Sequence, residues 1–420
     1  MIFSRRTGLL IAVVATTLAL AAGVAWALTG DLTYEGCFAD TATAGCTVPS
    51  DPALDFAIGV TVSPDGNSVY VSSEADDSIS HFTRDPSTGD LTYEGCFADT
   101  AADGCAVPAQ AVLAGATYAA VSPDNKSVYV VSRDDSSLVH FTRDLTTGNL
   151  TYQGCFVDSA FAGCSVPAQA ALGNPRQVAV SPDNKSVYVV AGADNSISHF
   201  TRDLTTGNLT YQGCIADTAA DGCTVAAQPA LNGAKGVAVS PDNKSVYVAA
   251  FASDSIARFD RDTSTGNLTY QDCFADATGG CAVPASAALD AATGVAVSPD
   301  NKSVYVASDF GQSVSHFTRD TSSGSLTFQG CFAETNADGC EVPAQAALDG
   351  ARGVAVSPDN QSVYVASDGG ASISHFTRDT STGNLAFRAC IADSATAGCA
   401  VPAQAVLSLA VGVAVSPDNK

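Results

Sequence analysis

Short apolar runs alternate with turn-forming residues along almost the whole chain, and this pattern repeats every 59 residues. The tripeptide Ser-Pro-Asp marks the period, because its copies follow one another in steps of 59 residues with a single step of 58. These copies begin at Ser63, Ser122, Ser181, Ser240, Ser298, Ser357 and Ser416. A fixed period of this size indicates stacked supersecondary units. Helical periodicity is absent, so we expect units built from strands.

Each repeat contains four strand-like runs, named A to D here in chain order. In the third repeat they cover residues 177–180, 186–190, 196–200 and 208–211, which are rich in Val, Ile, Tyr, Phe and Thr. Turn-forming sequences separate the runs: Ser-Pro-Asp-Asn-Lys, an Asp-rich bend and Asp-Leu-Thr-Thr-Gly. Run B has Val-Tyr-Val at its centre and small residues beside it, which is typical of a strand buried on both faces.

Four short antiparallel strands per repeat predict an all-β fold, a β-propeller of four-stranded antiparallel blades. Each blade then packs its faces against its neighbours around a central channel, with run A innermost. A β-sandwich is the alternative fold. It is disfavoured, because a sandwich gives no reason for a strict period through the whole chain.

The two ends of the repeat array are irregular. Runs A and D occur seven times, whereas runs B and C occur six times. The first D run lies at 31–34, and the chain stops at Lys420 after a seventh A run and its turn. Strands A and D of one blade stand about 14 Å apart and cannot pair. We therefore expect a ring that is seven-bladed in the complete protein, a last blade that is incomplete in this chain, and about 25 residues after Lys420.

Composition supports a single domain over residues 28–420. Hydrophobic residues make up 46% of the chain and charged residues 15%, which leaves ample apolar surface for a packed core. The formal net charge is -24, from 43 acidic and 19 basic residues. Such a chain repels phosphate backbones and anionic lipid headgroups, so we expect no nucleic-acid partner.

Residues 1–27 have the pattern of a signal peptide. The pair Arg5-Arg6 precedes an apolar run over 9–24, and Ala-Trp-Ala at 25–27 is a small-x-small cleavage site. The arginine pair and the leucines after it also resemble a twin-arginine export signal. An uncleaved anchor is the alternative, because the apolar run is nearly long enough to span a bilayer. We expect cleavage, no membrane span in the remaining chain, and a secreted or cell-envelope (periplasmic or extracellular) protein.

The 14 cysteines form seven local pairs, one per repeat, and we expect both members of each pair in the connection from run D to the next run A. An even count, one pair per repeat and an export signal together predict disulfides. The predicted pairs are Cys37/Cys46, Cys96/Cys105, Cys155/Cys164, Cys214/Cys223, Cys273/Cys281, Cys331/Cys340 and Cys390/Cys399. Metal binding is the alternative, but two thiols without a second Cys or His pair make a poor tetrahedral site. We expect no metal and no cofactor.

The fourth repeat carries a family resemblance. Residues 236–249, Gly-Val-Ala-Val-Ser-Pro-Asp-Asn-Lys-Ser-Val-Tyr-Val-Ala, precede Asp-Ser-Ile at 254–256 and Arg-Asp-Thr-Ser-Thr-Gly at 261–266. This combination resembles the lactonase-type (6-phosphogluconolactonase-like, or YVTN-repeat) seven-bladed β-propellers over nearly all of the chain after residue 27. The resemblance implies the fold. For activity it implies less, because that superfamily includes sugar-lactone hydrolases, cycloisomerases and proteins of unassigned role.

Five histidines share one position in run C, and an arginine takes the sixth copy of that position. A residue that recurs in every blade usually serves the blade rather than a reaction centre. We therefore interpret these histidines as structural. They are His81, His140, His199, His316 and His375, with Arg258 in the remaining copy.

Positions where the repeats differ are the candidate site. The residue that opens run A is Ile58, Thr117, Arg176, Lys235, Thr293, Arg352 or Val411 in successive copies. Next to it, Tyr118 and Gln177 replace a residue that is Gly in every other copy. We predict a cationic channel mouth at Arg176, Lys235 and Arg352 that binds a small carboxylate or phosphate, or polarises a lactone carbonyl. The alternative is scatter among exposed positions, or pairing with local acids such as Asp349.

Two functions fit this pattern. A ligand- or protein-binding scaffold is favoured, because nearly identical blades leave little asymmetry for a reaction centre. The alternative is a lactonase-like hydrolase or cycloisomerase that acts on a small sugar or carboxylate lactone at the channel mouth. Catalytic residues stay unassigned, because no unique His, Glu or Asp converges with the three bases in the sequence pattern. We expect a monomer with a small anionic ligand or a protein as its partner.

Overall fold

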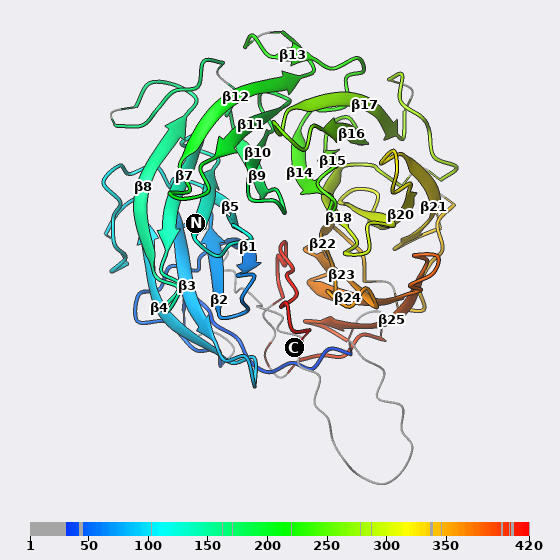
Figure 1. Ribbon diagram of the computed structural model, residues 1–420. Helices are drawn as coiled ribbons and strands as arrows, with labels where there is room; N and C mark the ends of the chain where they lie inside the picture. The colour runs from blue at the N-terminus through cyan, green and yellow to red at the C-terminus, as the bar shows by residue number, and fades with distance from the viewer. Residues whose placement is uncertain are drawn as a thin grey trace, which may run out of the picture.

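In the described part of the chain, six antiparallel sheets stand like blades around a central channel (Figure 1); five have four strands, and one has a short fifth strand at its outer edge. The computed structural model describes residues 31–419 apart from gaps at 42–44, 102, 162, 170, 220, 278, 287, 337–338, 346, 396–397, 403 and 405–406. The predicted signal peptide, 1–27, lies outside the described residues. Within the described ranges, no helix is long and apolar enough to cross a membrane.

The blades follow one another in chain order. Blade 1 contains β1 (Ala57–Val62), β2 (Ser68–Ser73), β3 (Ser78–Arg84) and β4 (Leu91–Ala98). Blade 2 contains β5 (Ala116–Val121), β6 (Ser127–Ser132), β7 (Ser137–Arg143) and β8 (Leu150–Val157). Blade 3 contains β9 (Pro175–Val180), β10 (Ser186–Ala191), β11 (Ser196–Arg202) and β12 (Leu209–Ala216), with β13 (Thr224–Val225) at its outer edge.

The second half of the ring has the same order. Blade 4 contains β14 (Ala234–Val239), β15 (Ser245–Ala250), β16 (Ser255–Arg261) and β17 (Leu268–Ala275). Blade 5 contains β18 (Ala292–Val297), β19 (Ser303–Ser308), β20 (Ser313–Arg319) and β21 (Leu326–Ala333). Blade 6 contains β22 (Ala351–Val356), β23 (Ser362–Ser367), β24 (Ser372–Arg378) and β25 (Leu385–Ala392).

Burial along the strands follows their place in the blade. Every residue of β10 is buried, as is every residue of the five strands that correspond to it. This confirms the prediction that run B is covered on both faces. The innermost strands, such as β9 and β14, contact one another around the channel. The outermost strands alternate between partly buried and exposed residues in their first half and are partly or fully buried in their second half. The hydrophobic core therefore lies between blades rather than at one centre.

The outermost strands are longer than predicted. Run D was expected to end at Tyr211, but β12 continues to Ala216. It must do so because it pairs with all of β11, up to Ser196 opposite Ala216. The expectation that both cysteines of a pair lie in the connection is therefore wrong for the first cysteine of blades 1 to 6, which lies inside the outermost strand. These strand residues are Cys96, Cys155, Cys214, Cys273, Cys331 and Cys390.

The second cysteine of each pair does lie in the connection, as expected. In every repeat it directly precedes the residue that forms a parallel bridge to the strand or segment holding the first cysteine. These connection residues are Cys46, Cys105, Cys164, Cys223, Cys281, Cys340 and Cys399. Each disulfide thus spans from the outermost strand, or from the N-terminal segment for Cys46, to the segment beside it.

All seven predicted cysteine pairs are disulfides, with Cα–Cα distances of 4.8–4.9 Å. They are Cys37–Cys46, Cys96–Cys105, Cys155–Cys164, Cys214–Cys223, Cys273–Cys281, Cys331–Cys340 and Cys390–Cys399. After the second cysteine of blade 3, β13 runs parallel to β12, and isolated parallel bridges take the same place in the other repeats. Each disulfide therefore fastens a short segment to the exposed edge of a blade, which would otherwise offer unpaired backbone groups.

A recurring hydrogen-bond network joins neighbouring blades. At the junction of blades 2 and 3, Arg202 Nη2 lies 3.0 Å from Asp124 Oδ1, and Arg202 Nε donates to the Tyr129 hydroxyl at 2.9 Å. His140 Nε2 lies 3.2 Å from Ser127 Oγ, and its ring stacks on Tyr129. Burial lowers the pKa of His140 to about 4, so the ring is neutral near pH 7. These contacts agree with a structural role for the recurring histidines.

Two segments without assigned strands lie between blades 6 and 1 (Figure 1). In the C-terminal segment, a Cβ on Gly412 would lie close to the Ile58 carbonyl of blade 1, and Asp418 forms a 3.0 Å ion pair with Arg84. In the N-terminal segment, Asp31 pairs with Arg388 of blade 6 at 2.9 Å. The Phe38 ring packs on Phe82 of blade 1, as Phe97 packs on Phe141.

Candidate functional site

The channel opens at the end of the ring where the innermost strands begin. Arg176, Lys235 and Arg352 are the second residues of β9, β14 and β22. All three line one cavity of about 210 Å³, together with Tyr118 and Gln177. The structure therefore brings together the five residues that the sequence pattern singles out for ligand binding. No cysteine lines this cavity, so the disulfides serve the blade edges and not the site.

A β-bulge sets the position of each cation. The ladder between β14 and β15 shifts register between Ala234 and Gly236, so Lys235 is an extra residue between two paired ones. The ladders of blades 3 and 6 shift in the same way at Arg176 and Arg352. A bulged residue leaves the ladder and its side chain takes a new direction, which is why bulges recur beside functional sites.

The innermost strands approach one another closely just after the bulge. A Cβ on Gly236 would collide with the carbonyl oxygen of Thr293 in the next blade. Tyr118 and Gln177 occupy this position in blades 2 and 3, and both line the cavity. Gln177 Oε1 accepts a 2.6 Å hydrogen bond from the backbone N–H of Val237. Gln177 therefore links the inner strands of blades 3 and 4 and also presents its side chain to the cavity.

Arg352 is neutralised by two carboxylates. Its Nε donates to Asp309 Oδ2 at 2.9 Å, and its Nη2 lies 2.9 Å from Asp368 Oδ2. The alternative, pairing with local acids, thus holds for this cation, but Asp349, which was given as an example of such an acid, is not one of the two partners. That carboxylate instead accepts a hydrogen bond from Gln312 Nε2 at 2.5 Å.

Arg176 and Lys235 are the cations available to a ligand. Among the described residues, neither has a carboxylate within the 4.0 Å ion-pair distance. Lys235 Nζ lies 3.5 Å from the centroid of the Phe251 ring. Burial, with the charges of Arg352 and Arg176, lowers the pKa of Lys235 to about 8. An anion bound here would relieve this repulsion between like charges.

Glu74 contributes a carboxyl group to the same cavity. Its side chain is 13% exposed and forms an ion pair with Arg133 Nη1. Burial raises the pKa of Glu74, while the charges of Arg133 and Arg176 oppose that shift. The sequence pattern left the catalytic residues unassigned, and the structure places two acids beside the three bases: Glu74 lines their cavity, and Asp309 is bonded to Arg352.

The signal for these acids lies just past run B, at the residue that follows the second strand of each blade. In successive blades this residue is Glu74, Arg133, Gly192, Phe251, Asp309 and Asp368. Run B is antiparallel to run A, so its end lies beside the start of run A, as Ala250 beside Ala234 shows. Comparing the repeats at this second variable position would have found Glu74, Asp309 and Asp368.

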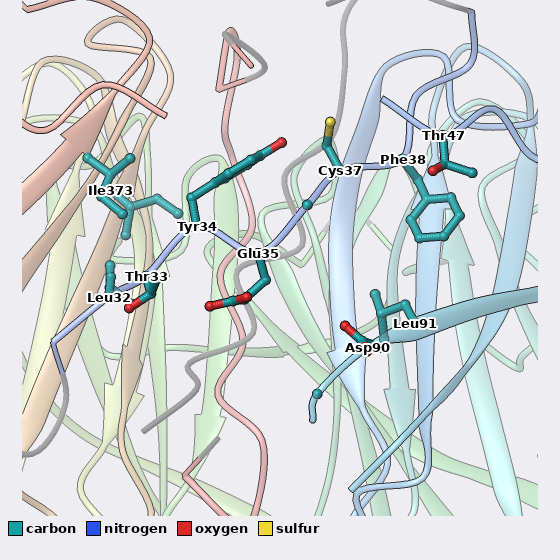
Figure 2. Close-up of a pocket in the computed structure, with 13 residues that line it drawn as sticks. Leu32, Thr33, Tyr34, Glu35, Cys37, Phe38, Thr47, Asp90, Leu91 and Ile373 are labelled. Carbon is teal, nitrogen blue, oxygen red and sulfur yellow. The ribbon is translucent and has the colours of Figure 1, made fainter. Parts of the chain in front are cut away.

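A second cavity, of about 230 Å³, lies between the N-terminal segment and blades 1 and 6 (Figure 2). Leu32, Tyr34 and Ile373 form one side, and Leu91 lies across the gap. The lining residues include no Lys, Arg or His. This cavity therefore lacks the cationic groups that distinguish the channel mouth, and its charged lining residues are the acids Glu35 and Asp90.

The described residues contain no obvious metal-binding site. No group of three or more His, Cys, Asp or Glu is placed there to hold a metal ion. The prediction that the protein needs no cofactor stays a prediction.

The protein is a β-propeller with disulfides at the outer edges of its blades. The mouth of its channel is lined by charged residues that differ from blade to blade. Segments 33–154, 106–225, 174–330 and 274–401 match the family profile described as "Lactonase, 7-bladed beta-propeller". These segments span most of the chain, so the protein belongs to this lactonase family. The comparison with curated protein sequences finds no match.

Solved structures share the fold at low sequence identity. A candidate 6-phosphogluconolactonase from Bacteroides fragilis is 18% identical, with a TM-score of 0.58, and the match covers 90% of this chain and 92% of that one. The periplasmic gluconolactonase of Pseudomonas aeruginosa is 16% identical, with a TM-score of 0.56 and coverage of 79% and 84%. A Lactobacillus plantarum protein is 16% identical, with a TM-score of 0.58 and coverage of 86% and 87%. At these identities the likeness concerns the fold alone.

Proposed function

We propose that the protein is a lactonase-like hydrolase that opens a small anionic lactone at the channel mouth. Family membership supports this activity, and so does the gluconolactonase among the similar structures. One observation carries the proposal: the mostly buried carboxyl group of Glu74 shares a cavity with Arg176 and Lys235. Neither cation is neutralised by a carboxylate among the described residues.

In this proposal the three groups divide the reaction between them. Glu74 accepts a proton from water as the water oxygen adds to the lactone carbonyl carbon. Arg176 and Lys235 stabilise the negative charge that develops on the carbonyl oxygen, and they hold the anionic substituent of the substrate. The ring C–O bond then breaks, and Glu74 returns the proton to the leaving ring oxygen. One water molecule is consumed, the product is a hydroxy acid, and Glu74 is restored.

A binding scaffold has weaker support. That function rests on the likeness of the blades, but the likeness stops at the channel mouth. There the residues that open run A and follow run B differ from blade to blade. The asymmetry that a reaction centre needs is therefore present at the channel mouth.

The proposal is tested by hydrolysis of gluconolactone and 6-phosphogluconolactone, measured as acid release above the spontaneous rate. Wild-type protein should accelerate hydrolysis, and Arg176→Ala should lose at least about tenfold in kcat/KM, because a charged hydrogen bond to the substrate is removed. Lys126→Ala, a change in an exposed turn, is the control and should behave as wild type. Equal rates with and without wild-type protein on both lactones would overturn the proposal.

We also propose that the ring has a seventh blade, which is incomplete in this chain. Its outermost strand would be the segment from Asp31 to Phe38, and its innermost strand residues 411–415. Two contacts support this assignment, because they copy those of a complete blade: Phe38 packs on Phe82, and Asp418 pairs with Arg84 as Asp65 pairs with Arg143. The cavity in Figure 2 would then lie where the two middle strands of that blade belong.

The seventh blade is tested by adding the two middle strands. A second copy of residues 362–380, fused after Lys420, should raise Tm by about 5 °C or more, because its apolar side chains become buried between blades 6 and 1. A scrambled copy of the same composition is the control. A fusion that melts with the scrambled control would contradict a seven-bladed ring.

We propose that residues 1–27 direct export and that residues 28–420 act outside the cytoplasm. The seven disulfides support this compartment, since disulfides persist where conditions are oxidising. N-terminal sequencing of the exported protein should begin at Leu28, and an intact Met1 would contradict cleavage. Replacing Arg5 and Arg6 by Lys should stop export if the twin-arginine route is used.

A further inference from the structure

Two pockets lie on the outer side of the ring, away from the channel mouth. One is at the junction of blades 1 and 2, the other is at the junction of blades 3 and 4, and each has a volume of about 240 Å³. Neither shares a lining residue with the channel cavity. Both are the same feature of the repeat, named the outer pocket here, because residues at the same repeat positions line them. These residues are His81, Glu94, Gly95 and Asn149 in the first pocket, and His199, Gln212, Gly213 and Asn267 in the second.

A β-bulge gives the outer pocket its open space. The ladder between β11 and β12 shifts register, so that Gln212 is an extra residue before Gly213. Gly213 has a φ of 151°, and a Cβ on it would meet no other atom within 4 Å. Glycines with the same open space occupy this position in blades 1, 2, 3 and 5: Gly95, Gly154, Gly213 and Gly330. Because bulges recur beside functional sites, this space is a candidate for a ligand.

Two other blades hold an ion pair at this place instead. In blade 4, Arg258 and Asp272 replace the histidine and the glycine, and Arg258 Nη2 lies 2.7 Å from Asp272 Oδ2. In blade 6, Arg388 replaces the glutamine and pairs at 2.9 Å with Asp31, which stands at the position of the asparagine. The fold therefore does not require the open pocket, since the strands of these two blades pair in the same register without it.

The hydrogen-bonding groups of the outer pocket are fixed before any ligand binds. Gln212 Nε2 donates to Thr201 Oγ1 at 3.0 Å, and the side chain of Asn267 is hydrogen-bonded to His199. Burial lowers the pKa of His199 to about 4, so its ring is neutral at pH 7. Apolar side chains complete the lining: Ile197, Ile215 and Leu268. The pocket thus combines neutral polar groups from two blades with aliphatic side chains.

This combination is complementary to a neutral ring that carries hydroxyl groups. Hydroxyl groups can donate to and accept from amide and imidazole groups, while the C–H side of the ring packs on aliphatic side chains. The pocket between blades 3 and 4 is lined by no Lys, Arg, Asp or Glu, and the net charge of -24 repels polyanions. In blade 1, Glu94 takes the place of Gln212 and is likewise an acceptor for hydroxyl groups.

We propose that the outer pockets of blades 1, 2, 3 and 5 each bind one unit of a neutral polysaccharide. A repeating pocket suits a repeating ligand, because the first bound unit holds its neighbours at a high effective concentration near the other pockets. The ring is then a multivalent glycan-binding protein in addition to any activity at the channel mouth. This inference does not depend on the proposed function, since the two sites have no residue in common.

An array of neutral glycans, followed by titration with a neutral polysaccharide that it identifies, tests the proposal. Wild-type protein should bind at least one neutral polysaccharide and should not bind alginate, a polyanion. Replacing all four pocket asparagines by Ser should weaken binding of the polymer about 100-fold or more, because the contacts act together. Ser325 occupies this position in blade 5, so the turn tolerates the change. The four asparagines are Asn149, Asn208, Asn267 and Asn384.

Substitutions in a single pocket give a graded result. Asn267→Ser alone should weaken polymer binding about twofold to fivefold, as expected for one lost hydrogen-bonding group. His199→Arg combined with Gly213→Asp copies the ion pair of blade 4 and should weaken binding as much, without any change at the asparagine.

A double variant in the same turns is the control. Leu145 and Leu204 are exposed and line neither pocket, and Thr263 stands at their position in blade 4. Leu145→Thr with Leu204→Thr should therefore bind the polymer as wild type does, and so should Arg176→Ala in the channel. Wild-type protein that binds no neutral glycan, or a folded fourfold asparagine variant with an unchanged Kd, would overturn the proposal.

Discussion

Blade 3 contains two arginines with opposite surroundings. Arg202, at the end of β11, has a fully buried side chain that reaches Asp124, Tyr129 and Ser127 of blade 2. Arg176, at the start of β9, lines the channel cavity and has no carboxylate within 4.0 Å among the described residues. The first arginine recurs in every complete blade, whereas the position of the second changes from blade to blade. Recurring residues hold the repeat units together, and functional residues occupy the positions free to vary.

The two regions also lie at opposite ends of the strands. The innermost strands begin at the channel mouth and end at the Ser-Pro-Asp turns, whose aspartates accept the recurring arginines. A change at the mouth therefore leaves the junction networks intact. This separation predicts that stability and ligand binding respond to different substitutions in the same blade.

The largest expected effect on stability is at the junction. Arg202→Ala removes the partner of Asp124 and of the Tyr129 hydroxyl, and should lower the free energy of unfolding by about 3 kcal/mol. Arg176→Ala should change it by less than about 0.5 kcal/mol while weakening anion binding. Urea unfolding and a binding titration on both variants measure the two effects. The comparison fails if Arg176→Ala unfolds the protein as readily as Arg202→Ala.

Removing one disulfide should lower the free energy of unfolding slightly less than Arg202→Ala does. Replacing both Cys214 and Cys223 by Ser frees a short loop, and should cost roughly 2.5–3 kcal/mol in the chain-entropy model. Urea midpoints under oxidising conditions measure the loss. Anion binding should be unchanged, since this disulfide fastens the outer edge of the blade. A double variant as stable as wild type would show that the outer edge contributes little to the junctions.

Anion binding should depend on pH through Lys235. Its pKa is lowered to about 8, so the ammonium is charged at pH 7 and largely neutral at pH 9. The Kd for glucuronate, which stays anionic across this range, should rise about threefold to tenfold between these values. Lys235→Arg keeps its charge at pH 9 and should abolish the rise. A Kd that rises equally in the variant would assign the titration to another group.

The smallest expected effect is on the pH dependence of Tm, and it comes from Asp76, an acid on the mouth side of blade 1. Burial and the neighbouring carboxylates raise the pKa of Asp76 to about 7 from 3.8. A raised pKa means that the protonated form stabilises the fold, fully below pH 3.8, and that this contribution is lost as pH rises through 7. Wild-type Tm should therefore fall by about 1–2 °C between pH 5.5 and pH 8. Asp76→Asn should reduce that fall, and an unchanged fall would remove Asp76 from the account.

Much of the fold could be predicted from the sequence because the same pattern of strands and turns recurs in every repeat, so no strand assignment depends on a single copy. Run B could be read as a fully buried strand from Val-Tyr-Val, and β10 confirms it. The disulfide partners could be read from one local cysteine pair per repeat. The place of the first cysteine, such as Cys214, could not, because the extension of β12 to Ala216 is set by pairing with β11 rather than by local preference.

The sequence predicted the basic residues of the site but not the acidic ones. Arg176, Lys235 and Arg352 stand out because the compared position opens the innermost strand. Glu74 and Asp309 were missed, because the end of run B reaches the mouth only once the two strands pair. The pairing of Arg352 with Asp309 could not be predicted either, since Asp309 belongs to the neighbouring blade 5.

The pH dependence and rate of lactone hydrolysis by Glu74→Gln test the central claim most directly. The channel mouth, and not the recurring network, should carry the chemistry. We predict that Glu74→Gln lowers kcat for lactone hydrolysis by about 100-fold or more, as expected for loss of a general base. Its Tm should stay within about 2 °C of wild type, and Glu94→Gln, on the outer strand β4, should keep full activity. A Glu74→Gln protein that is folded and hydrolyses the lactone at the wild-type rate would contradict the account.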